Sequence, residues 1–208
     1  MKKEFLELFS SVPELLKPLF DAYDTPWEML SHLSDYLLEI TKNPPKGYSL
    51  LQKDDGVFPH SKASSGILVG EGAKIEDFVT ILPPAVICHG ATLRQGAYLR
   101  GSVFLGEGAI AGHGTEMKNT VLMDGAKAPH LSYLGDSILG KNAHLGAGVI
   151  LSNLRLDKGE IFVKFEGKKI PTSRRKLGSI IGDNTEIACG TVLNPGTIIP
   201  KNSMILPK

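Results

Sequence analysis

The chain contains few cysteines, little excess charge and no long apolar run. Its two cysteines, Cys88 and Cys189, lie far apart in the sequence, which argues against a disulfide framework and for a reducing compartment. A net charge of +1 gives no global preference for nucleic acid or for an anionic membrane. The sequence has neither a signal sequence nor a stretch that could span a bilayer, so we expect a cytoplasmic protein with no membrane partner.

An aliphatic or small residue returns at every sixth position from Val69 to Met123. The repeat resumes at Leu134, takes one five-residue step to Leu139, and continues near the end of the chain. Helices repeat every 3.6 residues and strands every two, so neither explains a period of six. The positions of the series are Val69, Ile75, Ile81, Ile87, Leu93, Leu99, Leu105, Ala111, Met117, Met123, Leu134, Leu139, Leu145, Leu151, Ile181, Ile187, Leu193, Ile199 and Ile205.

A fixed short repeat is typical of a solenoid, in which each coil buries its inner face only against its neighbours. A period of six fits a three-sided coil with two inward positions on each side. We therefore predict an all-β, parallel β-helix of the hexapeptide-repeat type, with weaker matches at Val57 and Ala63 adding one edge upstream. Glycine often follows the aliphatic position, and we attribute this to corner backbone angles that glycine reaches without a Cβ clash. These glycines are Gly70, Gly106, Gly112, Gly135, Gly140, Gly146 and Gly182.

Residues 1–45 lack both the hexad and glycine. Three helices are predicted here: one near the N-terminus, one capped by Ser11, and a longer one capped by Asp24 or Thr25. We interpret the segment as a helical hairpin that covers the open first coil, since solenoids need capped ends. A partner-binding or oligomerising pair of helices is the alternative. The chain then divides into this helical cap and a β-helix domain, residues 46–208.

Two irregular stretches interrupt the repeat. In the first, Lys127 stands where a small inward residue is expected, and Pro129 stands at the aliphatic position. The second is a long inserted loop near 152–179, in which residues 160–169 predict a small hairpin. The basic cluster 174–176 follows the hairpin. Three roles stay open for this cluster: a solvated face, a contact between subunits, or a site for the phosphates of coenzyme A.

Several strings in these stretches carry a resemblance to a known family. His130-Leu-Ser-Tyr-Leu-Gly-Asp, Leu145-Gly-Ala-Gly-Val-Ile and Ser152-Asn153 resemble the acetyltransferase domain of the bifunctional N-acetylglucosamine-1-phosphate uridyltransferases. The string Ser173-Arg-Arg-Lys-Leu-Gly-Ser-Ile-Ile-Gly-Asp is most similar to the archaeal-type sugar-1-phosphate nucleotidylyltransferase/acetyltransferases. The resemblance covers roughly residues 65–200. It implies left-handed coiling and a homotrimer with active sites between neighbouring prisms.

The resemblance also implies a role for each matching residue. His130 is the expected general base toward the amine of an amino-sugar 1-phosphate. Arg100 and Lys118 are the expected partners of its phosphate. Tyr133 and Asn153 are the expected partners of its sugar.

Further positions complete the expected site. The backbone N–H of Ala147 matches the donor that steadies the thioester oxygen of acetyl-CoA. His144 stands where the bacterial family has a substrate-binding asparagine, and Leu154 stands where it has an aromatic residue, so both positions affect which sugar is accepted. Cys189 is a candidate for lining the coenzyme A groove.

The chemistry is coherent without the family. Acetyl transfer from a thioester needs a free amine, so a base must take a proton, and an imidazole with a pKa of about 6.5 serves near neutral pH. The developing oxyanion needs an aimed N–H donor. A phosphate needs cations, which a guanidinium and an ammonium supply. No set of His, Cys or carboxylate residues has the spacing of metal ligands, so we expect no metal.

Two functions remain open. The first is an acetyl-CoA-dependent N-acetyltransferase acting on an amino-sugar 1-phosphate, such as glucosamine 1-phosphate, in nucleotide-sugar and cell-envelope precursor synthesis. The second is a non-catalytic sugar-phosphate-binding or assembly subunit that partners a separate nucleotidyltransferase. Arg100 and Lys118 read alone could be solvated corner residues, and Tyr133 could simply fill a gap. A glycine-rich nucleotide loop is missing, so we expect no uridyltransferase activity from these 208 residues.

Overall fold

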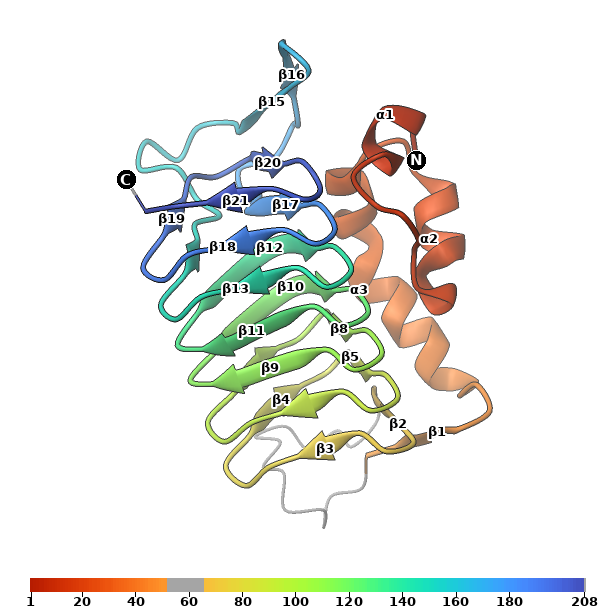
Figure 1. Cartoon of the computed structure of the whole chain (residues 1–208). Helices are drawn as coiled ribbons and strands as arrows, with labels where there is room; N and C mark the ends of the chain where they lie inside the picture. Colours follow the sequence, from red (N-terminus) through yellow and green to blue (C-terminus); the bar gives the residue numbers. More distant parts are fainter. Residues whose placement is uncertain (52–65, 208) are drawn as a thin grey trace.

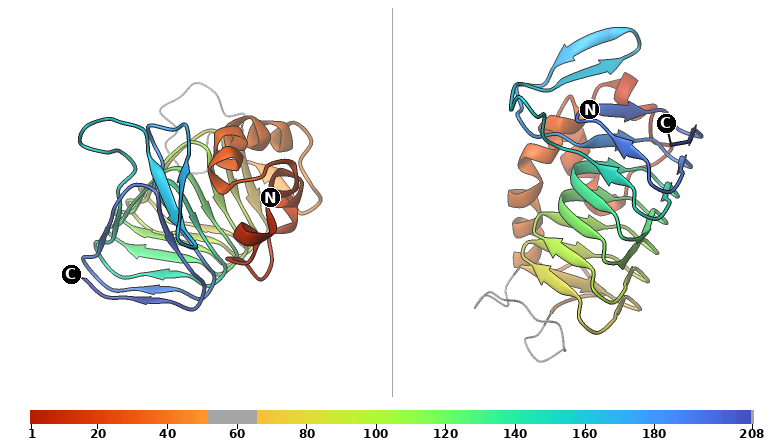
Figure 2. Two further views of the ribbon diagram at one scale, coloured as in Figure 1. Left: turned by 90° about the horizontal axis from the view of Figure 1, so that it is seen from above. Right: turned by 90° about the vertical axis from the view of Figure 1, so that its left-hand side faces the viewer.

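The computed structural model describes residues 1–51 and 66–207, which form a three-sided parallel β-helix with helices along one flank (Figure 1). The front strands in Figure 1 point to the left while the chain climbs from its first coil to its last, so the coiling is left-handed. The view from above in Figure 2 places the helices outside one side of the prism. The predicted fold class is confirmed, while Val57 and Ala63 lie outside the described residues.

The strands stack in register on three faces, which we call faces A, B and C. The short strand β1 (Tyr48–Leu50) joins β2 in antiparallel fashion at the first coil. Face A contains β2 (Ile67–Gly70), β5 (Ala85–Ile87), β8 (Val103–Leu105), the second halves of β10 (Glu116–Leu122) and β12 (Tyr133–Leu139), β17 (Ser179–Ile181) and β20 (Thr197–Ile199). Face B contains β4 (Thr80–Leu82), β7 (Tyr98–Arg100), the first halves of β10 and β12, β14 (Ile150–Leu151) and β19 (Val192–Leu193). Face C contains β3 (Lys74–Ile75), β6 (Thr92–Leu93), β9 (Ile110–His113), β11 (Lys127–His130), β13 (His144–Leu145), β18 (Glu186–Ile187) and β21 (Met204–Ile205).

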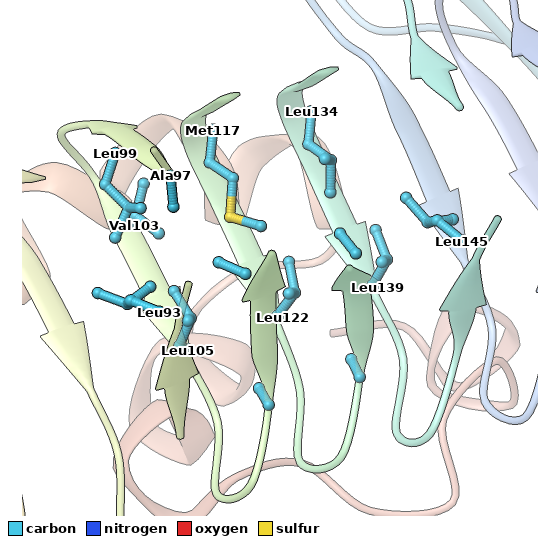
Figure 3. Packing of buried hydrophobic residues seen from close by; sticks show 14 of the residues in the cluster. Leu93, Ala97, Leu99, Val103, Leu105, Met117, Leu122, Leu134, Leu139 and Leu145 are labelled. Atoms are coloured by element: carbon cyan, nitrogen blue, oxygen red, sulfur yellow. The ribbon is translucent and has the colours of Figure 1, made fainter. Parts of the chain in front are cut away.

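Alternate side chains from all three faces point inward and form one continuous apolar core. Parallel pairing puts equivalent inward residues of successive coils next to one another, so each coil covers the one below it. Figure 3 shows these neighbours, among them Leu99, Met117, Leu134, Leu105, Leu122 and Leu139.

The repeat takes its first five-residue step one coil earlier than the sequence suggests. Leu122 pairs with Leu105 and points into the core, so the step runs from Met117 to Leu122. The six-residue repeat predicts Met123 as the next core residue, but its side chain lies outside the prism, where the helices bury it. The long strands β10 and β12 therefore both turn the corner between faces B and A with one residue fewer than β7 and β8 use below them.

The same step corrects two further predictions. Ala128 occupies the inward position that was assigned to Pro129, and Lys127 is exposed instead of facing inward. The irregularity predicted around Pro129 is thus a consequence of the preceding corner, because every inward position after it moves by one residue.

The seven glycines that follow aliphatic positions mark places where successive coils approach closely. None of the seven has a positive φ, so the predicted reason for them, a backbone angle that favours glycine, is wrong. A Cβ on Gly106 would lie 2.6 Å from the backbone nitrogen of Asp124, and one on Gly146 would lie 2.5 Å from that of Cys189. Positive φ occurs instead at other glycines, such as Gly108 with a φ of 64°.

The N-terminal segment contains α1 (Lys3–Leu6), the 3₁₀ helix η1 (Glu14–Leu16), α2 (Lys17–Ala22) and α3 (Pro26–Lys42). Thr25 caps α3, as predicted: its Oγ1 accepts a hydrogen bond from the N–H of Glu28, and the Glu28 carboxylate accepts one from the N–H of Thr25. The prediction that Ser11 caps the second helix is wrong, because η1 begins only at Glu14 and has Pro13 at its N-cap.

The helices lie along face A rather than over the open first coil (Figures 1 and 2). Buried side chains of α3, including Trp27, Leu30 and Leu33, share an apolar cluster with the residues that point outward from this face. Face A is apolar on both sides, so the helices remove its outer side from water along most of its length. The outward column is Leu68, Val86, Phe104, Val121, Ile138, Ile180 and Ile198. The division of the chain at residue 45 stays a prediction.

The inserted segment contains the predicted hairpin, formed by β15 (Phe162–Phe165) and β16 (Lys168–Pro171). Phe165 stacks on Phe5 of α1 with ring centroids 5.1 Å apart. Arg174 donates from Nη1 to the backbone oxygen of Trp27 at 2.9 Å and to the hydroxyl of Ser31. The first residue of the basic cluster therefore fastens the insertion to α3, a role that was not among the three considered from the sequence.

Candidate functional site

Four polar side chains lie side by side on the outer surface of face B, and we call them the face-B cluster: Arg100, Glu116, Lys118 and Tyr133. They point outward because Leu99, Met117 and Leu134, which alternate with them, are buried in the core. Parallel pairing places Glu116 next to Tyr133 and Met117 next to Leu99, which brings Lys118 beside Arg100.

An ion pair joins two members of this cluster. Arg100 donates from Nη1 to Oε1 of Glu116 at 2.6 Å, and this bond raises the pKa of the guanidinium. The two side chains are 39% and 36% exposed, so the pair stabilises the fold by less than about 1 kcal/mol. A guanidinium has five N–H donors, and Glu116 accepts from only one nitrogen of Arg100, so the other donors of Arg100 do not bond to Glu116.

Asn153 lies beside the cluster, where the insertion leaves β14. The Tyr133 hydroxyl donates to Oδ1 of Asn153 at 3.4 Å, and Nδ2 of Asn153 donates to the buried Asp136 carboxylate at 2.6 Å. Burial, followed by the negative charges of Glu116 and Asp136, raises the pKa of Tyr133, so its phenol stays a hydrogen-bond donor at neutral pH. One side of the prism therefore brings together four of the predicted residues: Arg100, Lys118, Tyr133 and Asn153.

His130 lies in a separate column at the corner between faces C and B. It is exposed and pairs in register with His113, and its backbone oxygen accepts a hydrogen bond from the N–H that follows Ala147. Cys189 continues the column one coil above Ala147. Within residues 1–51 and 66–207 the ring of His130 makes no hydrogen bond, whereas Nδ1 of His113 contacts the backbone oxygen of Gln95 at 2.7 Å.

The other predicted positions divide between this corner and face C. The backbone N–H of Ala147 forms no hydrogen bond to the described part of the chain, so it is available to an acceptor. Cys189 is exposed, whereas Cys88 is buried, and burial raises the pKa of its thiol to about 12. His144 lies on face C with its Nδ1 2.8 Å from Glu186, so the single chain does not bring it to the face-B cluster.

A groove of about 620 Å³ lies along face B, and its lining includes Ser152 and Leu154, the two chain neighbours of Asn153. Its floor includes Val192, which pairs with Ile150, which in turn pairs with Tyr133. The wall is the start of the insertion, including Leu154 and Phe162. Sequence reasoning missed this groove because its floor and wall come from different coils.

Two acidic residues at the site were also missed as functional candidates. Glu116 pairs with Arg100, and Asp136 holds the amide of Asn153. The sequence does contain a signal for Asp136, because this residue ends the His130-Leu-Ser-Tyr-Leu-Gly-Asp string that carries the family resemblance. No group of three or more His, Cys, Asp or Glu side chains in the described ranges is arranged to hold a metal ion.

Residues 81–205, which include the face-B cluster, His130 and Asn153, match the family model described as the GMPPB C-terminal domain. The chain belongs to this family. It is 35% identical over 181 residues to the bifunctional protein GlmU of Methanococcus maripaludis, covering 86% of this chain and 41% of that protein. It is 36% identical over 146 residues to the bifunctional sugar-1-phosphate nucleotidylyltransferase/acetyltransferase of Sulfurisphaera tokodaii, covering 70% of this chain and 36% of that protein.

The resemblance stated from the sequence is confirmed by these matches. The chain spans less than half the length of both relatives. Among solved structures, the acetyltransferase domain of PglB from Neisseria gonorrhoeae matches with 16% identity and a TM-score of 0.30, covering 67% of this chain and 54% of that one. No helix within the described residues is both long and apolar enough to cross a membrane.

Proposed function

We propose that this chain transfers the acetyl group of acetyl-CoA to the amine of an amino-sugar 1-phosphate, with glucosamine 1-phosphate as the substrate. The supporting observation is the grouping of a guanidinium, an ammonium, a phenol and a carboxamide on face B, next to the corner that carries His130. The Sulfurisphaera relative is a bifunctional sugar-1-phosphate nucleotidylyltransferase/acetyltransferase, so its name joins a sugar 1-phosphate to acetyl transfer. We place the reaction in nucleotide-sugar and cell-envelope precursor synthesis in the cytoplasm.

The cations of the face-B cluster hold the substrate's phosphate in this proposal. Arg100 offers the N–H donors that Glu116 leaves unused, and Lys118 adds a compact charge beside it. Tyr133 and Asn153 then contact the sugar hydroxyls. The phosphate anchors the substrate and contributes binding energy that orients the amine.

His130 acts as the base in this mechanism. It takes a proton from the amine as the nitrogen attacks the carbonyl carbon of the thioester, and the N–H of Ala147 stabilises the resulting oxyanion. The C–S bond then breaks, the thiolate of coenzyme A leaves, and the imidazolium returns the proton to it. Cys189, one coil above Ala147 in the same column, lines the path of coenzyme A.

Release of free thiol tests the reaction directly. We expect the chain to release coenzyme A when acetyl-CoA is mixed with glucosamine 1-phosphate, and to release little with free glucosamine, which lacks the phosphate that the two cations bind. A thiol reagent measures the rate, and a panel of amino-sugar 1-phosphates measures the specificity. Binding of a sugar phosphate without thiol release from any member of the panel would instead support the non-catalytic subunit.

We also propose a homotrimer in which a neighbouring chain covers the corner of His130. Phe78 and Leu131 lie at equivalent positions of this corner with φ of 61° and 49°, where two neighbouring coils have Gly114 and Gly148. They are 67% and 60% exposed. A left-handed conformation costs a bulky residue roughly 1–2 kcal/mol, and exposure of its apolar surface brings no compensation in a single chain. Contact with a second chain would bury these apolar side chains and so compensate for the strained backbone.

Leu131→Gly tests this interface. We expect the variant to dissociate from trimer to monomer at concentrations at which the wild type stays assembled, because it removes the exposed apolar side chain while relieving the backbone. Light scattering coupled to size exclusion measures the mass. Leu38→Gln, on α3 at the opposite flank, is the control and should stay trimeric. A monomeric wild type would contradict the proposed assembly.

A further inference from the structure

Asp136 is a carboxylate that is only 5% exposed and is held between two amides. Its Oδ1 accepts a hydrogen bond from Nδ2 of Asn119 at 2.8 Å, and its Oδ2 accepts one from Nδ2 of Asn153 at 2.6 Å. Asn119 and Asp136 both have a φ of 49° and occupy the corner between faces B and A. This is the corner that β10 and β12 turn with one residue fewer than the coils below.

Asn119, Asp136 and Asn153 form a hydrogen-bonded row, and the chemistry of this row fixes which way each amide points. A carboxylate has acceptors only, so both asparagines must turn their NH₂ groups toward Asp136. The carbonyl oxygen of Asn153 must then point the other way, toward the hydroxyl of Tyr133, and it does so at 3.4 Å. Without the carboxylate, either end of the Asn153 amide could face the substrate.

We infer that Asp136 is a positioning residue that fixes the amide orientation of Asn153 and so presents an acceptor beside Tyr133 to a hydroxyl of the sugar. This inference rests on the proposed function for its kinetic consequence, since Asn153 is the group that contacts substrate there. Asp136 itself is covered by Asn119 and Asn153 and acts through the latter.

Asp136→Asn is the first test. The new amide has one acceptor and one NH₂ group. It can therefore accept a hydrogen bond from the NH₂ group of only one of its two neighbours, Asn119 or Asn153, and it faces the other with its own NH₂ group. We expect the inverted Asn153 amide to predominate and the KM for glucosamine 1-phosphate to rise about tenfold, which is the scale of one lost hydrogen bond between the neutral Asn153 carbonyl and a sugar hydroxyl. The kcat should change much less than KM, because His130 and Ala147 are untouched.

The exchange variant Asn119→Asp with Asp136→Asn is the matched rescue. The carboxylate at position 119 forces the new amide to turn its NH₂ toward it and its oxygen toward Asn153. The orientation of Asn153 is thereby restored, and both residue types tolerate the left-handed backbone at these positions. We expect KM to return to within about threefold of the wild type. If Asp136→Asn alone does not fold, this variant decides the question, since a KM that stays tenfold high contradicts the inference.

Two further variants separate positioning from stability. Asn119→Ser leaves Asp136 in place to orient Asn153, so it should lower Tm and leave KM unchanged. Asn142→Asp puts a charge at an unrelated corner with a φ of 56° and should also leave KM unchanged. A KM that rises as much in Asn119→Ser as in Asp136→Asn would show that the row only stabilises the corner.

The orientation of Asn153 can also be measured by NMR without any enzymatic turnover, so this inference can be tested separately from the proposed function. In protein labelled with ¹⁵N-asparagine, we expect the side-chain amide signals of Asn153 to shift in Asp136→Asn and to return in the exchange variant. If the wild type releases no thiol, the transferase proposal fails while these signals still decide the orientation. Unchanged Asn153 signals in Asp136→Asn would overturn the inference whatever the activity.

Discussion

Replacing His130 with alanine should lower kcat for acetyl transfer about 100- to 10,000-fold, the usual contribution of a general base. The binding of glucosamine 1-phosphate should change little, because Arg100, Lys118, Tyr133 and Asn153 lie on face B and do not depend on the imidazole. Steady-state thiol release gives kcat, and calorimetric titration of the sugar phosphate gives Kd. A large loss in kcat at constant Kd is the pattern of a residue that acts in the transition state.

His113→Ala is the matched control for this experiment. His113 lies in the coil below and pairs in register with His130, and it is also exposed, but its Nδ1 contacts the backbone oxygen of Gln95. We expect it to keep most of the wild-type kcat. Equal losses in the two variants would point to a disturbed corner, and an active His130→Ala would remove the base from the mechanism.

The core of the prism could be predicted almost entirely from spacing, but its register could not. The six-residue repeat correctly identifies Leu99 and Leu105 as core residues, because each coil repeats the same inward positions. After Met117 the sequence offers both Leu122 and Met123, which are adjacent and similarly apolar. Burial does not distinguish them, since both are buried, one in the core and the other under the helices. Only the packing of the helices on face A decides between them.

The place of the helices was missed although a signal for it exists. The strands of face A are apolar at successive positions, as in Ala85–Ile87 and Val103–Leu105, instead of alternating. Continuous apolar strands predict a sheet that is covered on both sides. The expectation of a cap over the first coil came from a general property of solenoids and overlooked this local pattern.

The candidate site was predictable where its residues occupy equivalent positions of successive coils. Arg100 and Lys118 follow equivalent core positions, so stacking of the coils brings them together. The pairing of Asp136 with Asn119 and Asn153 was not predictable, because it depends on the corner at which the five-residue steps occur. The coiling alone does not bring His144 to the same surface.

Gly112→Ala should be among the most destabilising single substitutions in the chain. The added Cβ would overlap the carbonyl group of Pro129 in the coil above, where both contacting atoms belong to the backbone. A flexible side chain could move aside, but here the coils themselves must separate. We expect the free energy of unfolding to fall by about 4 kcal/mol or more, which urea denaturation followed by circular dichroism measures.

Gly108→Asn provides the comparison that isolates this close approach. Gly108 has a φ of 64° and open space where an added Cβ would lie, and asparagine tolerates this backbone conformation better than most residues. We expect a loss of no more than about 1 kcal/mol there. Similar losses in the two variants would mean that the coils separate easily at Gly112. Because Pro129 immediately precedes His130, a folded Gly112→Ala protein should also lose activity at temperatures well below its Tm, as the displaced coil carries the base with it.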